Sequence, residues 1–496
     1  MMICDATKTQ ARRRHILSAA LSTAPSERGQ SRKRGWLWCV MGMCVFAALY
    51  YVNTETAQAG SLEDLLLEKG HITSEEWAKL KAEAEQRESK KSEENKKKLE
   101  ESKKSEESRG VGDVPVKTKW YEKFSIRGYS QIRYNRLGQP NGSLINDQGD
   151  KSIGDNNGFF LRRARLILSG QPHDRVFIYI QPDFSSTVSG TGNAVQMRDW
   201  YADLFLTENK EWRIRAGQSK VPYGFENLQS SQNRLALDRD DALNSAVKDE
   251  RDLGFFLYYS PTHIRDLFRR LVDSGLKGSG DYGMLGVGAY NGQTANQPER
   301  NDNKHVIVRA DYPYEFANGQ VLEVGASAYR GNFVITKAAV VPEGGGAAVT
   351  PTGDTNILDE RVEAHFVLYP QPFGLQAEYT FGRGPELSPD RRSVGERSLY
   401  GGYVQAMYNY KCPAYCLSVF PFIRYQEYLG GKKHEANTPS NRVRELEFGA
   451  EIQINSHIEF TAEYTFTDRT SALATGPDPY KSQAGNLIRF QLQVNY

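Results

Sequence analysis

The last eleven residues of the chain, 486–496, alternate between apolar and polar side chains. Side chains on a strand point alternately to opposite faces, so this stretch has one apolar and one polar face. Its length suits a tilted strand that crosses a bilayer, which needs roughly 9–11 residues. A strand of a soluble sheet shows the same alternation, so this stretch alone does not distinguish a membrane strand from a soluble one. The rest of the chain is needed for that distinction. Apolar residues take every second position: Ile488, Phe490, Leu492, Val494 and Tyr496.

The same alternation recurs along the chain after residue 117. Leu446 and Phe448 alternate with Glu445 and Glu447, for example. Mean hydropathy is −0.60, which excludes a bundle of membrane helices but not a barrel of alternating strands. The pattern predicts these sixteen strands: Trp120–Leu137, Gly158–Gly170, Arg175–Phe184, Gln196–Thr207, Glu211–Pro222, Asp252–Ser260, Tyr282–Asn291, Lys304–Tyr314, Gln320–Arg330, Glu360–Tyr369, Phe373–Gly382, Leu399–Tyr410, Cys416–Leu429, Val443–Asn455, His457–Thr467 and Asn486–Tyr496.

Connection lengths separate a membrane barrel from a soluble sandwich. Long and short connections alternate along the chain, as in outer-membrane barrels with long outer loops and short periplasmic turns. The sequence therefore predicts an all-β fold, a sixteen-stranded antiparallel transmembrane β-barrel over residues 117–496. One expected short turn, Pro261–Asp281, is long, and its apolar residues have helical spacing. Aromatic residues near strand ends, among them Trp200, Tyr201, Trp212 and Tyr258, are candidates for the two interface girdles.

The N-terminus has the organisation of an export signal. Arg32–Arg34 precedes an apolar run from Trp36 to Val52, and Ala57-Gln-Ala59 has the small residues that a signal peptidase reads. We expect residues 1–59 to be a signal peptide; an uncleaved membrane anchor is the alternative.

Residues 60–116 form a separate charged segment. Thr73 and Glu76 have capping-box spacing, which predicts a helix start there. Lys and Glu then alternate in blocks that favour a solvated helix, although too few apolar residues follow for a strong coiled coil. We expect a helical, coiled-coil-like periplasmic segment and linker.

The mature chain keeps two of the five cysteines, Cys412 and Cys416. In an oxidising compartment they are expected to form a small disulfide across a turn. Two thiols without a nearby His cannot complete a tetrahedral metal site, so no metal is predicted there.

Basic side chains are predicted to line the lumen. A barrel of this size leaves an aqueous channel, and the long segment Tyr223–Arg251 is placed to fold into it. Guanidinium groups on a pore wall bind oxyanions and favour anions, unless they only neutralise acids such as Asp199 and Asp203. The candidate pore-lining, anion-binding residues are Arg163, Arg165, Arg213, Arg215, Lys220, Arg234, Arg239 and Arg251.

Three stretches resemble the phosphate-selective porin O and P family: Arg215–Glu226 with Ser230-Ser231, Phe160–Leu166, and Arg251–Gly254. Leu66–Glu76 is similar to the helical preface of many members. The resemblance implies a sixteen-stranded porin, usually trimeric, with an inward-folded third loop and a basic anion path.

The sequence departs from that pattern where selectivity is decided. Residues 117–496 hold 43 basic and 43 acidic residues, so the barrel is formally neutral. A basic wall opposite an acidic wall predicts a transverse field and only a modest anion preference. The acidic lumen positions are Glu378, Glu445, Glu447, Glu451, Glu459 and Glu463.

The functional expectation is an outer-membrane porin of a bacterial cell. Its expected partners are small anionic solutes such as phosphate, outer-membrane lipid and two further copies in a homotrimer. Interrupted basic clusters disfavour nucleic acid, and no catalytic group or cofactor motif is found, so no enzyme is predicted. The alternative is a surface barrel with a closed lumen that binds a partner or polysaccharide through its long loops.

Overall fold

The computed structural model describes residues 73, 120–137, 158–185, 195–472 and 481–496. The expected signal peptide and nearly all of the charged segment 60–116 lie outside these residues. The compact unit that contains every described strand runs from Lys117 to Tyr496.

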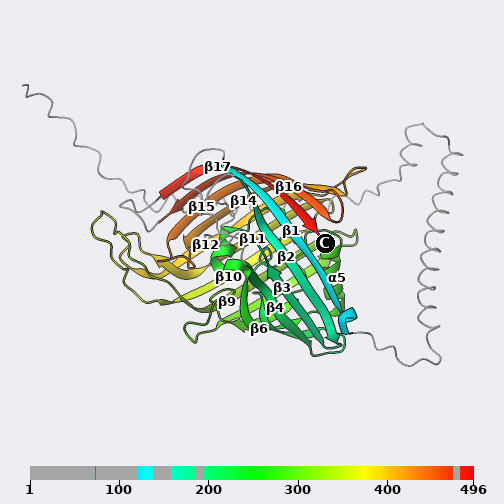
Figure 1. Cartoon of the computed structure of the whole chain (residues 1–496), viewed down its shortest axis with the longest axis horizontal. Helices are drawn as coiled ribbons and strands as arrows, with labels where there is room; N and C mark the ends of the chain where they lie inside the picture. Colours follow the sequence, from blue (N-terminus) through cyan, green and yellow to red (C-terminus); the bar gives the residue numbers. More distant parts are fainter. Residues whose placement is uncertain (1–72, 74–119, 138–157, 186–194, 473–480) are drawn as a thin grey trace, which may run out of the picture. The chain divides into compact units, whose positions relative to one another are not determined.

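This unit is one antiparallel sheet (Figure 1). Its first half consists of β1 (Phe124–Leu137), β2 (Gly158–His173), β3 (Val176–Asp183), β4 (Gln196–Phe205), β5 (Trp212–Lys220), β6 (Arg251–Tyr259), β7 (Leu285–Tyr290), β8 (His305–Glu315) and β9 (Val321–Val334). The second half consists of β10 (Asn356–Leu368), β11 (Phe373–Leu387), β12 (Val394–Tyr408), β13 (Tyr410–Lys411), β14 (Ser418–Gly431), β15 (Ser440–Gln453), β16 (Ile458–Ser471) and β17 (Lys481–Asn495).

The sheet closes on itself as a sixteen-stranded barrel. The two-residue β13 pairs with β14 beside β12, which it continues after Asn409, so the two form one strand of the wall. Every other strand pairs with its neighbours in sequence, and β1 pairs with both β2 and β17. Tyr129 faces Asn495 across the closing seam, and Gly128 and Tyr496 exchange two backbone hydrogen bonds of 2.6 and 2.9 Å. The predicted sixteen-stranded antiparallel barrel is therefore confirmed.

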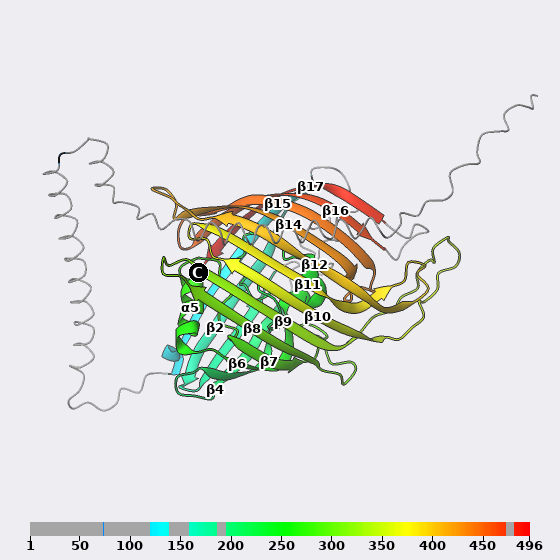
Figure 2. The same ribbon diagram turned by 180° about the vertical axis from the view of Figure 1, so that it is seen from behind.

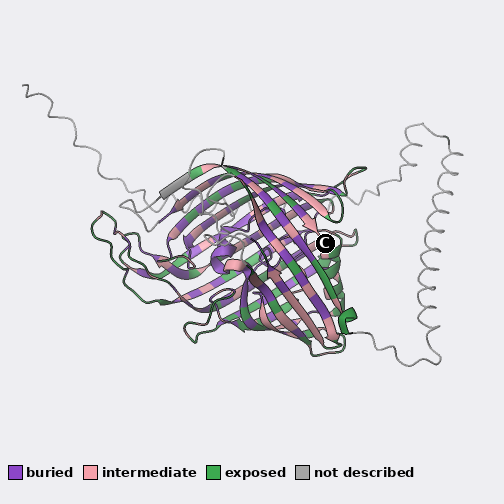
Figure 3. Ribbon diagram, viewed as in Figure 1, coloured by how far each residue is buried: buried purple, intermediate pink, exposed green. Residues whose placement is uncertain are grey.

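Alternation along the strands sets the two faces of the wall. Figure 3 shows buried and exposed residues in turn along many strands. Leu446 and Phe448 are exposed on the outer face, whereas Glu445 and Glu447 are buried on the inner face. An apolar outer face meets lipid, and a polar inner face meets the lumen, as the membrane interpretation of the sequence requires.

The strands differ from their predicted bounds chiefly at the end of the barrel that carries the long loops. β11 and β12 continue to the pair Leu387–Val394, so a predicted loop of Arg383–Ser398 shrinks to residues 388–393. Polar residues break the apolar alternation there, which hid these extensions in the sequence. At the opposite end, Trp120–Lys123 is a 3-10 helix, η1, and not part of the first strand.

The long connection after β6 contains the predicted helix, α5 (Thr262–Asp273). It buries Ile264, Phe268 and Leu271, and it lies at the barrel end that also holds the C-terminus (Figures 1 and 2). No helix among the described residues is long and apolar enough to cross a bilayer.

The expected girdle position is wrong for Tyr201 and Tyr258, which lie on the inner face. Trp120 and Trp212 are exposed near strand ends, whereas the exposed Trp200 lies in the middle of β4. Tyr258 is fully buried on the inner face, because it belongs to the polar set of β6 and packs against Arg213, whose Cζ lies 5.0 Å from its ring centre. Tyr201 also faces Arg215, with 3.9 Å between Cζ and the ring centre.

The closing seam leaves no room for a side chain at Gly128, and this can be tested. A Cβ atom there would lie 2.3 Å from the carbonyl oxygen of Arg165 and 2.5 Å from the Tyr496 ring. Gly128→Ala should lower barrel stability by about 1–3 kcal/mol, the usual cost of overpacking. Heat-modifiable migration on SDS gels measures it. Gly395→Ala is the matched control, because its Cβ meets nothing within 4 Å, and equal stability of the two variants would contradict the seam.

Candidate functional site: the constriction of the lumen

The segment between β5 and β6, residues 221–250, folds into the lumen; we call it the inner loop. It contains α4 (Asp241–Ala246) and the 3-10 helix η2 (Lys248–Glu250). Within 221–247 only Ser230, Gln232 and Asn233 are not buried. Barrel side chains replace water around a loop that would otherwise be exposed, so the inner loop fills part of the lumen.

The inner loop crosses to strands far from β5 and β6. The backbone N–H groups of Phe225 and Glu226 donate to the two carboxylate oxygens of Glu378 on β11, both at 3.0 Å. The N–H of Leu237 donates to Glu463 on β16 at 2.8 Å. These carboxylates satisfy loop donors that have no sheet partner, which explains acidic side chains on that wall.

Gly224 makes the crossing sterically possible. It has φ +74°, and a Cβ atom there would lie 2.1 Å from a carboxylate oxygen of Glu378. The Pro-Tyr-Gly stretch that carried the family resemblance therefore has a mechanical role, which is to bring the backbone against the β11 wall.

Acidic side chains of the inner loop pair with arginines across the lumen. Glu226 binds Arg424 at 2.7 Å, and Asp241 binds Arg469 at 2.7 Å. Asp238 binds Arg133 at 3.1 Å and also pairs with Arg489. Sequence reasoning missed these four wall arginines. The signal available was that three of them lie between apolar or aromatic neighbours on a strand: Arg133, Arg424 and Arg489. Arg469 lies between two polar residues and gave no such signal.

The predicted arginines of the other wall are also paired. Arg165 binds Asp183 at 2.8 Å, and Arg215 binds Asp203 at 2.7 Å. Arg213 pairs with Asp281, and Arg163 donates to Gln131 at 2.8 Å. All four face the lumen as expected, and for Arg165, Arg213 and Arg215 an adjacent carboxylate offsets the charge.

The remaining four candidates converge on one carboxylate, that of Glu250; we call this group the Glu250 cluster. One oxygen of Glu250 lies 3.5 Å from Lys220 Nζ and 2.5 Å from Arg251. The other lies 3.3 Å from both Arg234 and Arg239. Sequence separation hid this arrangement, because Lys220 and Arg251 lie on adjacent strands and the other two on the loop between them.

Arg251 also binds Asp199 at 2.9 Å, so the four basic side chains of the Glu250 cluster face two carboxylates and basic groups are in excess. Burial by itself raises the pKa of Glu250, but the surrounding Lys220, Arg239, Arg234 and Arg251 outweigh it and hold that pKa well below its usual value. Both terminal guanidinium nitrogens of Arg234 are buried and make no hydrogen bond to any described residue, although Nη2 is ion-paired with Glu250 at 3.3 Å. They are donors to which an oxyanion can bind.

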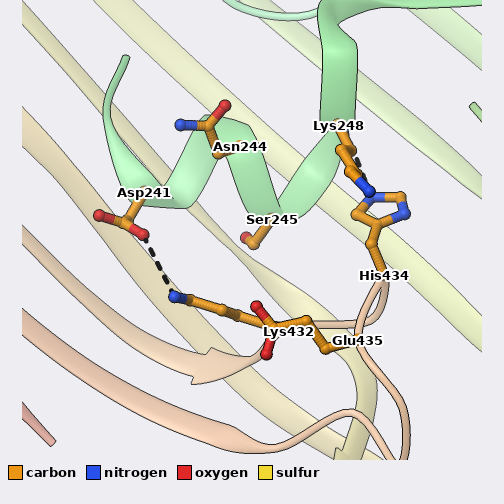
Figure 4. Close-up of a pocket in the computed structure, with 7 residues that line it drawn as sticks. All are labelled: Asp241, Asn244, Ser245, Lys248, Lys432, His434 and Glu435. Atoms are coloured by element: carbon orange, nitrogen blue, oxygen red, sulfur yellow. Dashed lines mark hydrogen bonds and ion pairs between the residues drawn. The ribbon is translucent and has the colours of Figure 1, made fainter. Parts of the chain in front are cut away.

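A small polar cavity of about 30 Å³ lies where α4 meets the loop after β14. Lys432 points to Asp241 with 3.7 Å between the charged atoms (Figure 4). His434 Nε2 accepts the backbone N–H of Lys248 at 3.4 Å (Figure 4). Burial, together with nearby Lys433 and Lys248, holds the pKa of His434 well below its usual value, so the ring is neutral and suited to accept this hydrogen bond.

Asp240 caps the first turn of α4. Its Oδ1 accepts from the N–H groups of Ala242 and Leu243, at 2.8 and 3.2 Å, while Oδ2 has no hydrogen-bond partner among the described residues. Burial raises the pKa of Asp240 to about 8, against the opposing effect of Arg424. A buried group of the inner loop therefore changes charge within a few pH units of neutrality.

The cysteines lie outside the lumen, in the short turn before β14. Cys412 and Cys416 form a disulfide with 5.5 Å between their Cα atoms.

The Asp238 pairs should hold the inner loop in place. Asp238→Ala leaves Arg133 and Arg489 buried without this partner, and breaking a buried pair typically costs about 3–5 kcal/mol. We expect a lower melting temperature in detergent and faster protease cleavage between residues 221 and 250. Asp354→Ala is the control, because Asp354 is exposed in the loop before β10. Equal cleavage in both variants would mean that the ion pairs do not fasten the loop.

Comparison with known protein families gives one match. The family model "Phosphate-selective porin O and P" matches residues 144–420. A comparison with curated proteins finds no match.

Among solved structures, the channel DcaP of Acinetobacter baumannii has 14% identity and a TM-score of 0.47, over 75% of this chain and 97% of that one. An anion-selective porin from Comamonas acidovorans has 10% identity and a TM-score of 0.44, over 75% and 99%. The trimer form of Vibrio cholerae OmpT has 12% identity and a TM-score of 0.46, over 75% and 99%.

The family match spans more than half of the chain and includes the inner loop with both strands that carry it. The chain therefore belongs to the phosphate-selective porin O and P family and is a porin of the bacterial outer membrane.

Proposed function

We propose that this porin passes small hydrophilic solutes by passive diffusion and has a modest preference for anions, with phosphate as the candidate solute. The Glu250 cluster carries the proposal. It places four basic side chains around Glu250 beside the inner loop, with Asp199 on Arg251 as the second carboxylate. The two terminal nitrogens of Arg234 have no hydrogen-bond partner among the described residues, and only Nη2 is ion-paired with Glu250. A local positive excess in a narrow, low-dielectric passage attracts anions.

The preference is modest because the rest of the lumen is charge-balanced. Arg165, Arg213 and Arg215 each pair with an aspartate, and Glu226, Asp238 and Asp241 of the inner loop each pair with a wall arginine. A solute therefore meets one positive cluster and not a continuous basic ladder. Arg163, Arg165, Arg213 and Arg215 contribute to the field of the wall in this proposal, and direct contact with the solute belongs to the Glu250 cluster.

The proposal extends to the assembly and the processing of the chain. Residues 1–59 serve as the export signal, residues 60–116 form a charged helical periplasmic segment, and the functional unit is a homotrimer, as the family resemblance implies. The exposed apolar residues of the outer wall, such as Ile126, Val306 and Val308, face lipid or the neighbouring copy. The disulfide of Cys412 and Cys416 holds the tip of one short turn.

Charge changes in the Glu250 cluster test the anion preference. One unit charge at about 10 Å in a water-like dielectric contributes ~0.4 kcal/mol, which is about a twofold change in a permeability ratio. Arg234→Gln should therefore lower the anion-to-cation ratio about twofold, and Glu250→Gln should raise it. Reversal potentials in a salt gradient across a planar bilayer measure the ratio.

Arg330→Gln is the matched control, since this arginine is exposed with 72% of its side chain accessible. Unchanged ratios in both cluster variants would overturn the role of the cluster. A wild-type protein with no discrete conducting steps would instead support the closed, partner-binding barrel.

The pKa of Asp240 predicts a pH dependence. Its value of about 8 in the folded protein lies above the ordinary 3.8, so between about pH 4 and pH 8 the folded chain holds a proton that the unfolded chain has lost. The free energy of unfolding therefore falls as pH rises through this window and levels off above it. Ionisation also adds a negative charge at the constriction, so the anion preference should fall between pH 6.5 and pH 9.

Asp240→Asn keeps the capping oxygen and removes the titration. Its anion preference should vary less than that of the wild type over the same range, while Asp354→Asn should follow the wild type. Reversal potentials at several pH values measure this. Identical pH profiles for Asp240→Asn and the wild type would contradict the assignment.

A further inference from the structure

Three adjacent strands bring a histidine and two carboxylates together inside the barrel. Asp311 on β8, Glu323 on β9 and His365 on β10 are all buried, and one ligand atom of each lies within 4.8 Å of the others. His365 Nε2 is 3.4 Å from Asp311 Oδ1 and 4.0 Å from Glu323 Oε1. The group is separate from the Glu250 cluster, which lies on β5, β6 and the inner loop.

Gly325 creates the space in which these groups meet. It pairs with Asp311 on one side and with His365 on the other, so it is the middle residue of a three-strand row. A Cβ atom at this position would lie 2.5 Å from His365 Nε2 and 2.8 Å from Asp311 Oδ1. The missing side chain lets residues two strands apart face each other above the central strand.

On the side away from the cluster, each of the three side chains contacts a further residue. His365 Nδ1 lies 2.8 Å from Glu363, which leaves Nε2 directed at the two carboxylates. Arg309 donates to Asp311 Oδ2, and the hydroxyl of Tyr369 donates to Glu323 Oε2. Such outer partners fix the tautomer and the orientation of metal-binding histidines and carboxylates.

One inward-facing atom is left without a donor. Glu323 Oε1 is fully buried and has no hydrogen-bond partner among the described residues. It faces a second carboxylate, that of Asp311, while Glu363 adds a third nearby. Arg309 offsets the charge of Asp311, so Glu323 is the carboxylate that still needs a cation or a proton. His365 supplies that cation only when it is protonated.

We propose that Asp311, Glu323 and His365 bind a divalent transition-metal ion, with Zn²⁺ as the reference ion. Zn²⁺ binds His nitrogen and carboxylate oxygen at about 2.0–2.2 Å, which puts neighbouring ligand atoms of a tetrahedron roughly 3.4 Å apart. The His365–Asp311 spacing already matches this value, and a small side-chain shift brings in Glu323. One imidazole with two carboxylates suits Zn²⁺ better than Mg²⁺ or Ca²⁺, which prefer oxygen ligands alone.

The site lies against the start of the inner loop. The Phe225 ring is 5.7 Å from the His365 ring, centre to centre, and Arg309 donates to the carbonyl oxygen of Gly224 at 3.0 Å. A bound ion would thus stiffen the wall on which the inner loop rests, so metal loading should raise the melting temperature of the barrel as well as occupy the site.

Zinc binding by the full-length protein in detergent tests the proposal. After treatment with EDTA, the protein is titrated with ZnCl₂ by calorimetry, and bound zinc is counted by mass spectrometry after desalting. We expect one Zn²⁺ per chain. Co²⁺ in place of Zn²⁺ should give the visible absorption of a nitrogen–oxygen site.

Two variants lower affinity for different reasons. Glu323→Gln removes one charged ligand without changing its shape, and Gly325→Ala fills the space while it keeps every ligand. Each should weaken Zn²⁺ binding at least tenfold. Glu363→Gln, which changes the outer partner of His365 and keeps all three ligands, should weaken it by about 10–100-fold. His457→Ala is the control, because His457 is an exposed histidine in a short turn.

Heat-modifiable migration first establishes that each variant is folded. The proposal is overturned if the wild type retains no zinc, in which case a proton shared by Asp311 and Glu323 accounts for the cluster. It is equally overturned if Glu323→Gln and Gly325→Ala, both folded, bind as tightly as His457→Ala, since the zinc would then lie elsewhere.

Discussion

Hydrocarbon offers no hydrogen bonds to a backbone, so a sheet that crosses a membrane must pair every strand on both edges. In this protein that demand falls on the contact between β17 and β1, which joins the two ends of a sequentially paired sheet. Gly128 and Tyr496 sit at the end of that seam, where their backbones exchange two hydrogen bonds. Closure then defines an inner face, and everything that concerns selectivity depends on what that face encloses.

The second constraint is electrostatic. The enclosed face carries many charged side chains that are removed from bulk water, and such charges are stable only when they are paired. The inner loop supplies much of the pairing: Asp238, Glu226 and Asp241 each reach an arginine on the far wall. Acidic wall residues in turn accept its backbone N–H groups. The same ion pairs that hold the constriction therefore limit how strongly it can prefer anions.

Much of the fold follows from local pattern. Alternation such as that of Leu446 and Phe448 against Glu445 and Glu447 has one stable arrangement in a membrane, so strand identity, strand order and the inward direction of Arg163, Arg165, Arg213 and Arg215 were predictable. The helix after β6 was predictable from its apolar spacing. Tyr258 was misassigned because an aromatic residue near a strand end suits both a girdle and a lumen, and only its parity along β6 separates the two.

By itself, the sequence determined that this chain is a closed barrel with an apolar outer face and a long, mixed-charge segment between its fifth and sixth strands. These properties depend on neighbours within a few residues. Tertiary structure alone decided which charges meet. The convergence of Lys220, Arg234, Arg239 and Arg251 on Glu250 depends on the path of the inner loop, and the meeting of Asp311 with His365 depends on the register of three strands around Gly325. Pairing across a lumen is set by distance in space, which alternation along one strand does not encode.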